Sequence, residues 1–219
     1  MSGIDQAWAA KAPPEQEEGS GYLAELRQNA RPLAAACLGA GSGLMLMAYT
    51  TTLFAPFLVK TFGWSRSQFA LVGLSMLSTL VALPFIGRMT DRLGVRRVAT
   101  IGALGIPLCL VAYSLMQGSF AVYFLISCTI LAAGSFGGPV VYTRLIAVHI
   151  RKARGLALTL VTITPALFGA LAAPALSWII EEWGWRTGYR ALALFVLAMS
   201  VIALLLVPRE NGRPMARTP

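Results

Sequence analysis

The sequence has little charge, a single histidine and few cysteines, and these shortages exclude several classes of protein. Charged residues make up 12% of the 219 residues. The three cysteines, Cys37, Cys109 and Cys128, lie in apolar stretches at spacings that fit neither a metal site nor a disulfide framework. No loop ending in Gly-Lys-Ser or Gly-Lys-Thr is present to cradle a phosphate. We therefore expect no metal site, no cofactor and no nucleotide-driven pump.

The shortage of histidine also argues against an enzyme. The segment Gly41-Ser42-Gly43 would suit an intramembrane serine protease only if a histidine lay at the same depth on a facing helix. His149, the single histidine, falls near a helix end and therefore at the wrong depth. Its imidazole suits either a polar cap to that helix or a proton relay.

Long apolar stretches account for most of the chain, with 57% hydrophobic residues and a mean hydropathy of +0.68. A membrane-spanning helix takes about 20 predominantly apolar residues, and six stretches reach that length. They cover residues 32–59, 67–87, 98–116, 120–146, 156–180 and 188–207. None alternates in polarity as a barrel strand would. The sequence predicts an all-α integral membrane protein with six transmembrane helices.

The two ends of the chain differ in composition from this apolar region. Residues 1–31 are acidic and rich in proline and glycine, so we expect a disordered tail. They lack the pattern of a cleaved signal peptide, and the first span is therefore expected to remain in the mature chain. Residues 208–219 are polar and basic, as at the start of a cytoplasmic loop or in a C-terminal tail.

The basic residues predict the orientation, because lysine and arginine are retained on the cytoplasmic side during insertion. If both termini are cytoplasmic, the outer loops hold only Lys60, Arg66, Arg186 and Arg190. The inner segments hold Lys11, Arg27, Arg31, Arg88, Arg92, Arg96, Arg97, Arg151, Lys152, Arg154, Arg209, Arg213 and Arg217. The net charge of +9 is thus spread over short loops beside the membrane, and no nucleic-acid partner is expected. We expect a multi-pass protein of the plasma or inner membrane.

A short basic segment with one acidic residue separates the second and third apolar stretches. It reads Gly87-Arg88-Met89-Thr90-Asp91-Arg92-Leu93-Gly94-Val95-Arg96-Arg97. This pattern resembles the signature between the second and third helices of major facilitator superfamily transporters. Three further segments are similar to bacterial members related to monocarboxylate and oxalate/formate porters. These are Phe62-Gly63-Trp64-Ser65-Arg66-Ser67, Gly184-Trp185-Arg186 and Arg151-Lys152-Ala153-Arg154-Gly155-Leu156-Ala157-Leu158. The tryptophans Trp64, Trp183 and Trp185 equally suit an aromatic belt at the membrane surface.

The resemblance implies the N-terminal half of a twelve-helix secondary transporter, built as a 3+3 inverted repeat and working by alternating access. It also implies that the basic segment closes the two halves on each other in the outward-facing state. The gate residues would be Gly87, Asp91, Arg92, Gly94, Arg96 and Arg97. The alternative is that the arginines only anchor the segment to anionic lipid, although Asp91 and the glycines would then have no role.

Arg144 lies within the fourth apolar stretch, where a charge is costly and therefore a candidate for function. It could anchor an anionic substrate or, like Arg151 and Arg154, pair with Asp91 at the gate. Gly137-Gly138-Pro139 is expected to bend or break the helix before it. In the first stretch, Tyr49 and Thr52 face either a neighbouring helix or a solute cavity, because hydroxyl groups at that depth need partners.

Six helices are half of a facilitator, which leaves three interpretations. The chain could be part of a twelve-helix protein, a half-transporter that pairs with a second copy, or a six-helix scaffold or sensor. We favour a transporter half for a small solute, with an organic anion preferred because of Arg144 and the monocarboxylate-like segments. No Asp or Glu lies in the apolar stretches, so a carboxylate for ion coupling would belong to the other half.

Overall fold

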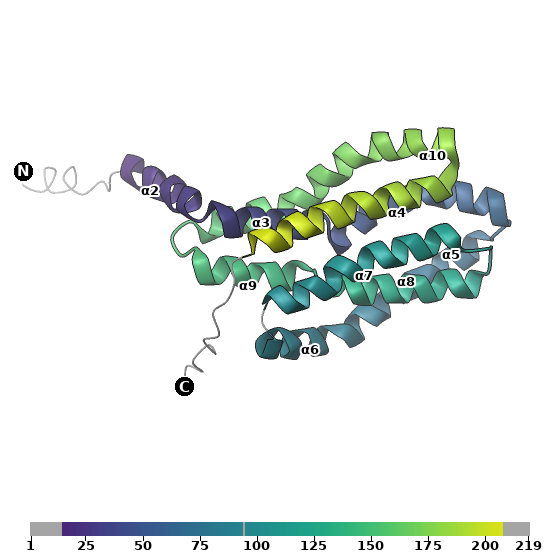
Figure 1. The fold of residues 1–219 in the computed structure, drawn as a ribbon, viewed down its shortest axis with the longest axis horizontal. Coiled ribbons are helices and arrows are strands. Elements are labelled where there is room, and N and C mark those ends of the chain that lie inside the picture. Colours follow the sequence, from purple (N-terminus) through teal and green to yellow (C-terminus); the bar gives the residue numbers. More distant parts are fainter. Residues whose placement is uncertain (1–14, 94, 208–219) are drawn as a thin grey trace, which may run out of the picture.

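A computed structural model of the chain describes residues 15–93 and 95–207, and in this part every regular element is a helix (Figure 1). The elements are α2 (Glu15–Gln28), α3 (Ala30–Gly41), α4 (Leu44–Phe62), α5 (Arg66–Val72), the 3₁₀ turn η1 (Gly73–Ser75), α6 (Met76–Leu93), α7 (Val95–Leu115), α8 (Phe120–Ser135), α9 (Pro139–His149) and α10 (Arg154–Leu206). The helices form one elongated bundle. The expected all-helical fold is confirmed.

Each apolar stretch coincides with helix, but two of the stretches are interrupted. The first breaks at Ser42 and Gly43, between α3 and α4. The fourth breaks at residues 136–138, where Pro139 starts the new helix α9 as its first residue. The expected break at Gly137-Gly138-Pro139 is therefore confirmed, whereas the break in the first stretch was not expected.

Within the described residues, four helical segments are long and apolar enough to cross a membrane, namely Ala30–Phe62, Ser67–Met89, Arg96–Leu115 and Arg154–Leu206. The last one, α10, has 53 residues, and as a straight helix it would extend about 80 Å. It folds back at Gly184, where φ is 82° and ψ is 161° (Figure 1). A left-handed φ favours glycine, and the fold-back falls between the stretches 156–180 and 188–207.

A helix occupies part of the N-terminal region that was expected to be disordered. α2 covers Glu15–Gln28, so the expectation is wrong for these residues, while residues 1–14 lie outside the described part. The reason is local: Leu-Ala-Glu-Leu-Arg at 23–27 consists of good helix formers, which outweigh Gly19 and Gly21. Tyr22 and Leu26 pack against the core formed by α3, α7, α9 and α10.

The core has two parts of different composition. Near the end that carries α2, small and aliphatic residues such as Ala35, Ala36 and Ala157 allow α3 and α10 to approach closely. Toward the other end, aromatic rings stack. Phe54 and Tyr189 lie parallel with centroids 3.8 Å apart, and Tyr113 lies 5.1 Å from Tyr189.

Two tryptophans belong to this aromatic core rather than to a belt at the surface. Trp64 and Trp185 are only 6% and 7% exposed, and Trp64 packs on Tyr123 at 5.1 Å. The Nε1 of Trp64 also donates to the carbonyl of Gly118. The belt interpretation is therefore wrong for these two, whereas Trp183 is exposed.

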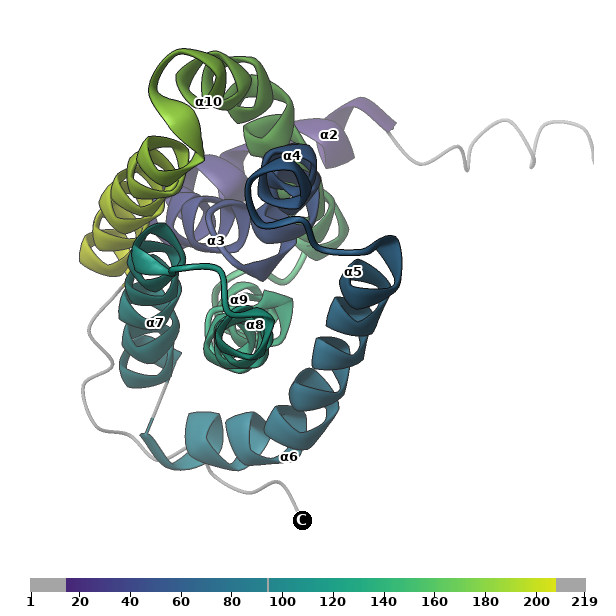
Figure 2. The same cartoon turned by 90° about the vertical axis from the view of Figure 1, so that its right-hand side faces the viewer.

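α5 and α6 curve around one side of the bundle (Figure 2), and many of their apolar side chains are exposed. Met76, Leu80 and Val81 are 70%, 65% and 66% exposed. The helices touch mainly α8 and α7 on their inner side. Such a face is stable only against lipid or another apolar surface.

Candidate functional site

The basic segment Gly87–Arg97 is helical on both sides of Gly94, which lies outside the described residues. α6 continues to Leu93 and α7 starts at Val95, so most of the segment is helical. Arg92 and Arg97 are exposed, and Arg96 is partly buried in the first turn of α7. Asp91 lies in the last turn of α6, but its side chain is outside the described part.

Gly87 is needed neither for a turn nor for close packing among the described residues. It lies inside α6, and the glycines with positive φ in the described residues are Gly63, Gly118 and Gly184. A Cβ built on Gly87 would meet nothing within 4 Å among the described residues.

The loop between α9 and α10 carries two of the candidate gate partners and is held by an acidic residue that sequence reasoning missed. Arg151 and Arg154 are exposed. The Glu25 carboxylate on α2 accepts hydrogen bonds from the backbone N–H groups of Arg151 at 2.9 Å, Lys152 at 3.3 Å and Ala153 at 2.7 Å. These N–H groups lie at the start of α10, where a helix attracts negative charge.

The backbone donors stabilise the ionised carboxylate. Hydrogen bonds from the Arg151 and Ala153 N–H groups lower the pKa of Glu25 below its ordinary value of 4.5. Glu25 therefore caps α10 as an anion at neutral pH. The signal in the sequence was the acid itself, which stood in a tail that composition alone marked as disordered.

α9 carries Arg144 and ends at the only histidine of the chain. The side chain of Arg144 lies outside the described part, so its proposed partners are untested. His149 donates from Nδ1 to the Leu145 carbonyl at 2.9 Å in the last turn of α9. This contact is the one expected of a polar cap at a helix end.

Tyr49 and Thr52 lie on an outward-facing strip of α4. Tyr49 is 50% exposed and Thr52 is exposed, whereas Thr50 between them is buried. The hydroxyl of Thr52 donates to the Tyr49 carbonyl at 3.4 Å, and Thr50 donates to the Leu46 carbonyl at 3.0 Å. Both threonine hydroxyls donate to carbonyls of their own helix, so neither needs a hydrogen-bond partner on a neighbouring helix.

The position of Tyr49 is fixed by a glycine on α10. A Cβ built on Gly169 would come within 2.9 Å of the Tyr49 Cβ and 3.0 Å of its Cγ. We call the parts of α10 before and after Gly184 its first and second arms. Gly169 therefore lets α4 approach the first arm closely. The approach leaves the ring of Tyr49 at the surface beside that arm.

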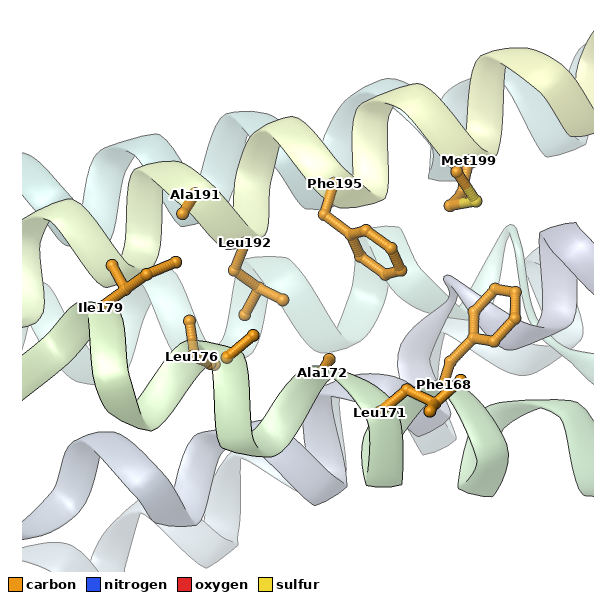
Figure 3. A pocket seen from close by; sticks show the side chains of 10 residues that line it. Phe168, Leu171, Ala172, Leu176, Ile179, Ala191, Leu192, Phe195 and Met199 are labelled. Atoms are coloured by element: carbon orange, nitrogen blue, oxygen red, sulfur yellow. The ribbon is translucent and has the colours of Figure 1, made fainter.

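An apolar cavity of about 390 Å³ separates the two arms of α10 (Figure 3). Its lining is Phe168, Leu171, Ala172, Ala175, Leu176, Ile179, Ala191, Leu192, Phe195 and Met199. Phe168 and Phe195 lie edge to face at 6.0 Å. No side chain of this lining is polar, so the cavity offers nothing to orient an anion.

Two arginines near the Gly184 fold-back were counted only as loop charges in the sequence. Arg186 donates to the Met116 carbonyl at 3.2 Å, and Arg190 donates from Nε to the Ser114 hydroxyl at 3.4 Å. They are four residues apart on one helix and so face the same neighbour, the end of α7. The four-residue spacing of Arg186 and Arg190 is the feature of the sequence that could have predicted this shared neighbour.

A family model of the Major Facilitator Superfamily matches residues 33–219, and the chain belongs to this superfamily. A search of curated proteins gives no match. The superfamily is one of membrane transporters, which agrees with the long apolar helices. The membrane and transporter classes expected from the sequence are thus supported, and the superfamily is not generally enzymatic.

Proposed function

We propose that the chain is one six-helix bundle of a secondary transporter that moves a small solute by alternating access. The observation that carries the proposal is the superfamily match over residues 33–219. In this assignment α3–α4, α5–α6, α7 and α8–α9 are the first four spans, and the two arms of α10 are the fifth and sixth. Both termini are cytoplasmic and the protein lies in the plasma or inner membrane, as the basic residues favour.

The two interrupted spans support an inverted repeat of three plus three helices. The first and fourth spans open the two repeats, and both are broken at glycines. The breaks also touch, because a Cβ on Gly43 would lie 3.0 Å from the Gly137 carbonyl oxygen. In transporters, paired breaks of this kind lie at the interface between repeats, next to the solute.

The open face of α6 supports a second six-helix bundle, since alternating access needs two bodies that move against each other. No described residue lies within 4 Å of a Cβ built on Gly87, and a helix of the other bundle would fill this space. We assign the closing contact of the two bundles to Gly87, Asp91, Arg92, Gly94, Arg96 and Arg97, with Arg144, Arg151 and Arg154 as candidate partners of Asp91. The second bundle is either the other half of a longer protein or a second copy.

The exposed strip of α4 is the proposed solute-facing surface. Tyr49 and Thr52 present oxygen atoms at membrane depth, and Arg144 would supply positive charge for an anion. Arg144, taken with the monocarboxylate-like segments of the sequence, favours a small organic anion of the monocarboxylate type. A coupling ion would bind elsewhere, because the apolar stretches contain no carboxylate.

The rival interpretation is a six-helix scaffold or sensor that moves nothing. Uptake into liposomes separates the two. The native protein, purified from its own membranes with any partner, is reconstituted and given labelled lactate, formate and oxalate in turn. Uptake of at least one solute above that of protein-free liposomes supports a transporter. Uptake equal to protein-free liposomes for the whole series contradicts the organic-anion assignment.

A further inference from the structure

A second cavity, of about 620 Å³, opens at the end of the bundle that carries α2. It lies where the end of α2, the start of α3, the start of α7 and the end of α10 meet. Its lining is Gln28, Arg31, Pro32, Arg96, Leu205, Leu206 and Val207. Unlike the cavity between the arms of α10, this one has polar and charged walls.

The charge of the lining is positive. Arg31 is exposed and Arg96 is partly buried, and they come from helices far apart in the sequence. None of the described lining residues is acidic. Glu25, three residues before Gln28, is the nearest described acid in the sequence. Its carboxylate is already bound to N–H groups of the loop before α10. Two arginines that line one cavity favour an anion inside it, especially a phosphate.

The rest of the lining is apolar. Pro32 forms one wall, and the last residues of α10 form another, with Leu205 pointing outward at 75% exposure. A free ion would leave these walls in water. A molecule with an anionic head and an apolar body would cover them, and the carboxamide of Gln28 adds hydrogen-bonding capacity to the rim.

We propose that this cavity binds the phosphate headgroup of an anionic phospholipid, with Arg31 and Arg96 on the phosphate and the acyl chains leaving past Leu205. The leaflet is the cytoplasmic one if the orientation in the proposed function holds, and that leaflet is rich in anionic lipid. Arg96 thereby contacts lipid in addition to its proposed place at the contact between bundles. The site itself does not depend on whether the protein transports a solute.

Native mass spectrometry of the purified protein tests the site directly. The probes are dioleoyl phosphatidylglycerol, dioleoyl phosphatidylcholine and inorganic phosphate, each added to the protein in a neutral detergent. The variants are Arg31→Gln, Arg96→Gln and the double variant, with Arg31→Lys as a charge-preserving form. The matched control is Arg27→Gln, since Arg27 is exposed one turn earlier on α2 and does not line the cavity.

We expect a phosphatidylglycerol adduct that weakens about fivefold with each arginine removed, while Arg27→Gln and Arg31→Lys bind within about twofold of the original chain. Two results would overturn the site: equal binding of phosphatidylcholine, or unchanged phosphatidylglycerol binding in the double variant. If inorganic phosphate displaces the lipid at equal concentration, the source is a soluble phosphate and the lipid assignment fails. Uptake of solute is not involved, so failure here leaves the proposed function untouched.

Discussion

The carboxylate of Glu25 accepts a 2.7 Å hydrogen bond from the backbone N–H of Ala153, the residue that precedes α10. The two residues are 128 positions apart. This contact joins α2 to the start of α10. An acid thus satisfies helix N–H groups that would otherwise depend on water.

Replacing Glu25 with glutamine should lower the melting temperature of the protein at neutral pH, because the neutral amide is a weaker acceptor for the helix N–H groups. The effect depends on pH. The folded pKa of Glu25 is below 4.5, so its contribution is present above the ordinary value and is lost as pH falls through the folded pKa.

The measurement is thermal unfolding in detergent at pH 7 and in steps below pH 4.5. Glu182→Gln serves as the control, because Glu182 is an exposed residue beside the Gly184 fold-back. The difference between Glu25→Gln and the original chain should shrink at low pH. A difference that is equally large at all pH values would contradict capping by the charged carboxylate.

Gly102→Ala should destabilise the bundle by about 1–3 kcal/mol through overpacking. The added Cβ would lie 2.5 Å from the backbone nitrogen of Gly137, and backbone cannot rotate away as a side chain can. Gly73→Ala is the matched control, because its Cβ would meet nothing within 4 Å. Thermal unfolding of both variants should separate them, and equal stability would mean that α7 does not approach the break between α8 and α9 this closely.

Gly87→Leu should leave the folding of this bundle intact and reduce solute uptake. Nothing within the described residues blocks a side chain at Gly87, whereas the proposed second bundle would. The control is Gly21→Leu, which places the same side chain on exposed α2. Uptake by Gly87→Leu at the rate of the control would argue against close packing of another helix at this point.

A cysteine in place of Thr52 should react with a charged thiol reagent, because a water-filled path lets the thiol ionise. The experiment uses a background in which Cys37, Cys109 and Cys128 are replaced by alanine. Leu108→Cys on α7 is the control, since Leu108 is 72% exposed and faces lipid in the proposed arrangement. We expect Thr52→Cys to react at least about tenfold faster. Equal rates would place Thr52 against lipid or another helix.

Periodicity and length predicted the helices well, because twenty apolar residues in a row leave few alternatives to helix. The fold-back at Gly184 was expected from the charged residues between two apolar stretches. The break at Ser42-Gly43 was not, since the apolar run continues through it without proline. That break depends on a contact between Gly43 and Gly137, which are far apart in sequence.

The site was less predictable than the fold for a related reason. Glu25 caps α10, and Arg31 and Arg96 line one cavity, only because separate helices come together. Trp64 looked like a surface residue because it ends an apolar stretch, but the ring folds inward onto Tyr123. The local sequence shows the type of each residue, but it does not show which residues from distant parts of the chain will lie beside it.

Uptake by the Asp91→Asn variant tests the central claim most directly. In the proposed transporter the charge of Asp91 helps to close the two bundles in one state. Its loss should therefore reduce labelled-solute uptake by the reconstituted native protein at least about tenfold, as expected when one partner of a charged contact is removed. Asp91→Glu, which keeps the charge, should retain part of the activity. Uptake by Asp91→Asn equal to that of the original protein, at equal amounts of folded protein, would contradict the assignment of this segment as the gate.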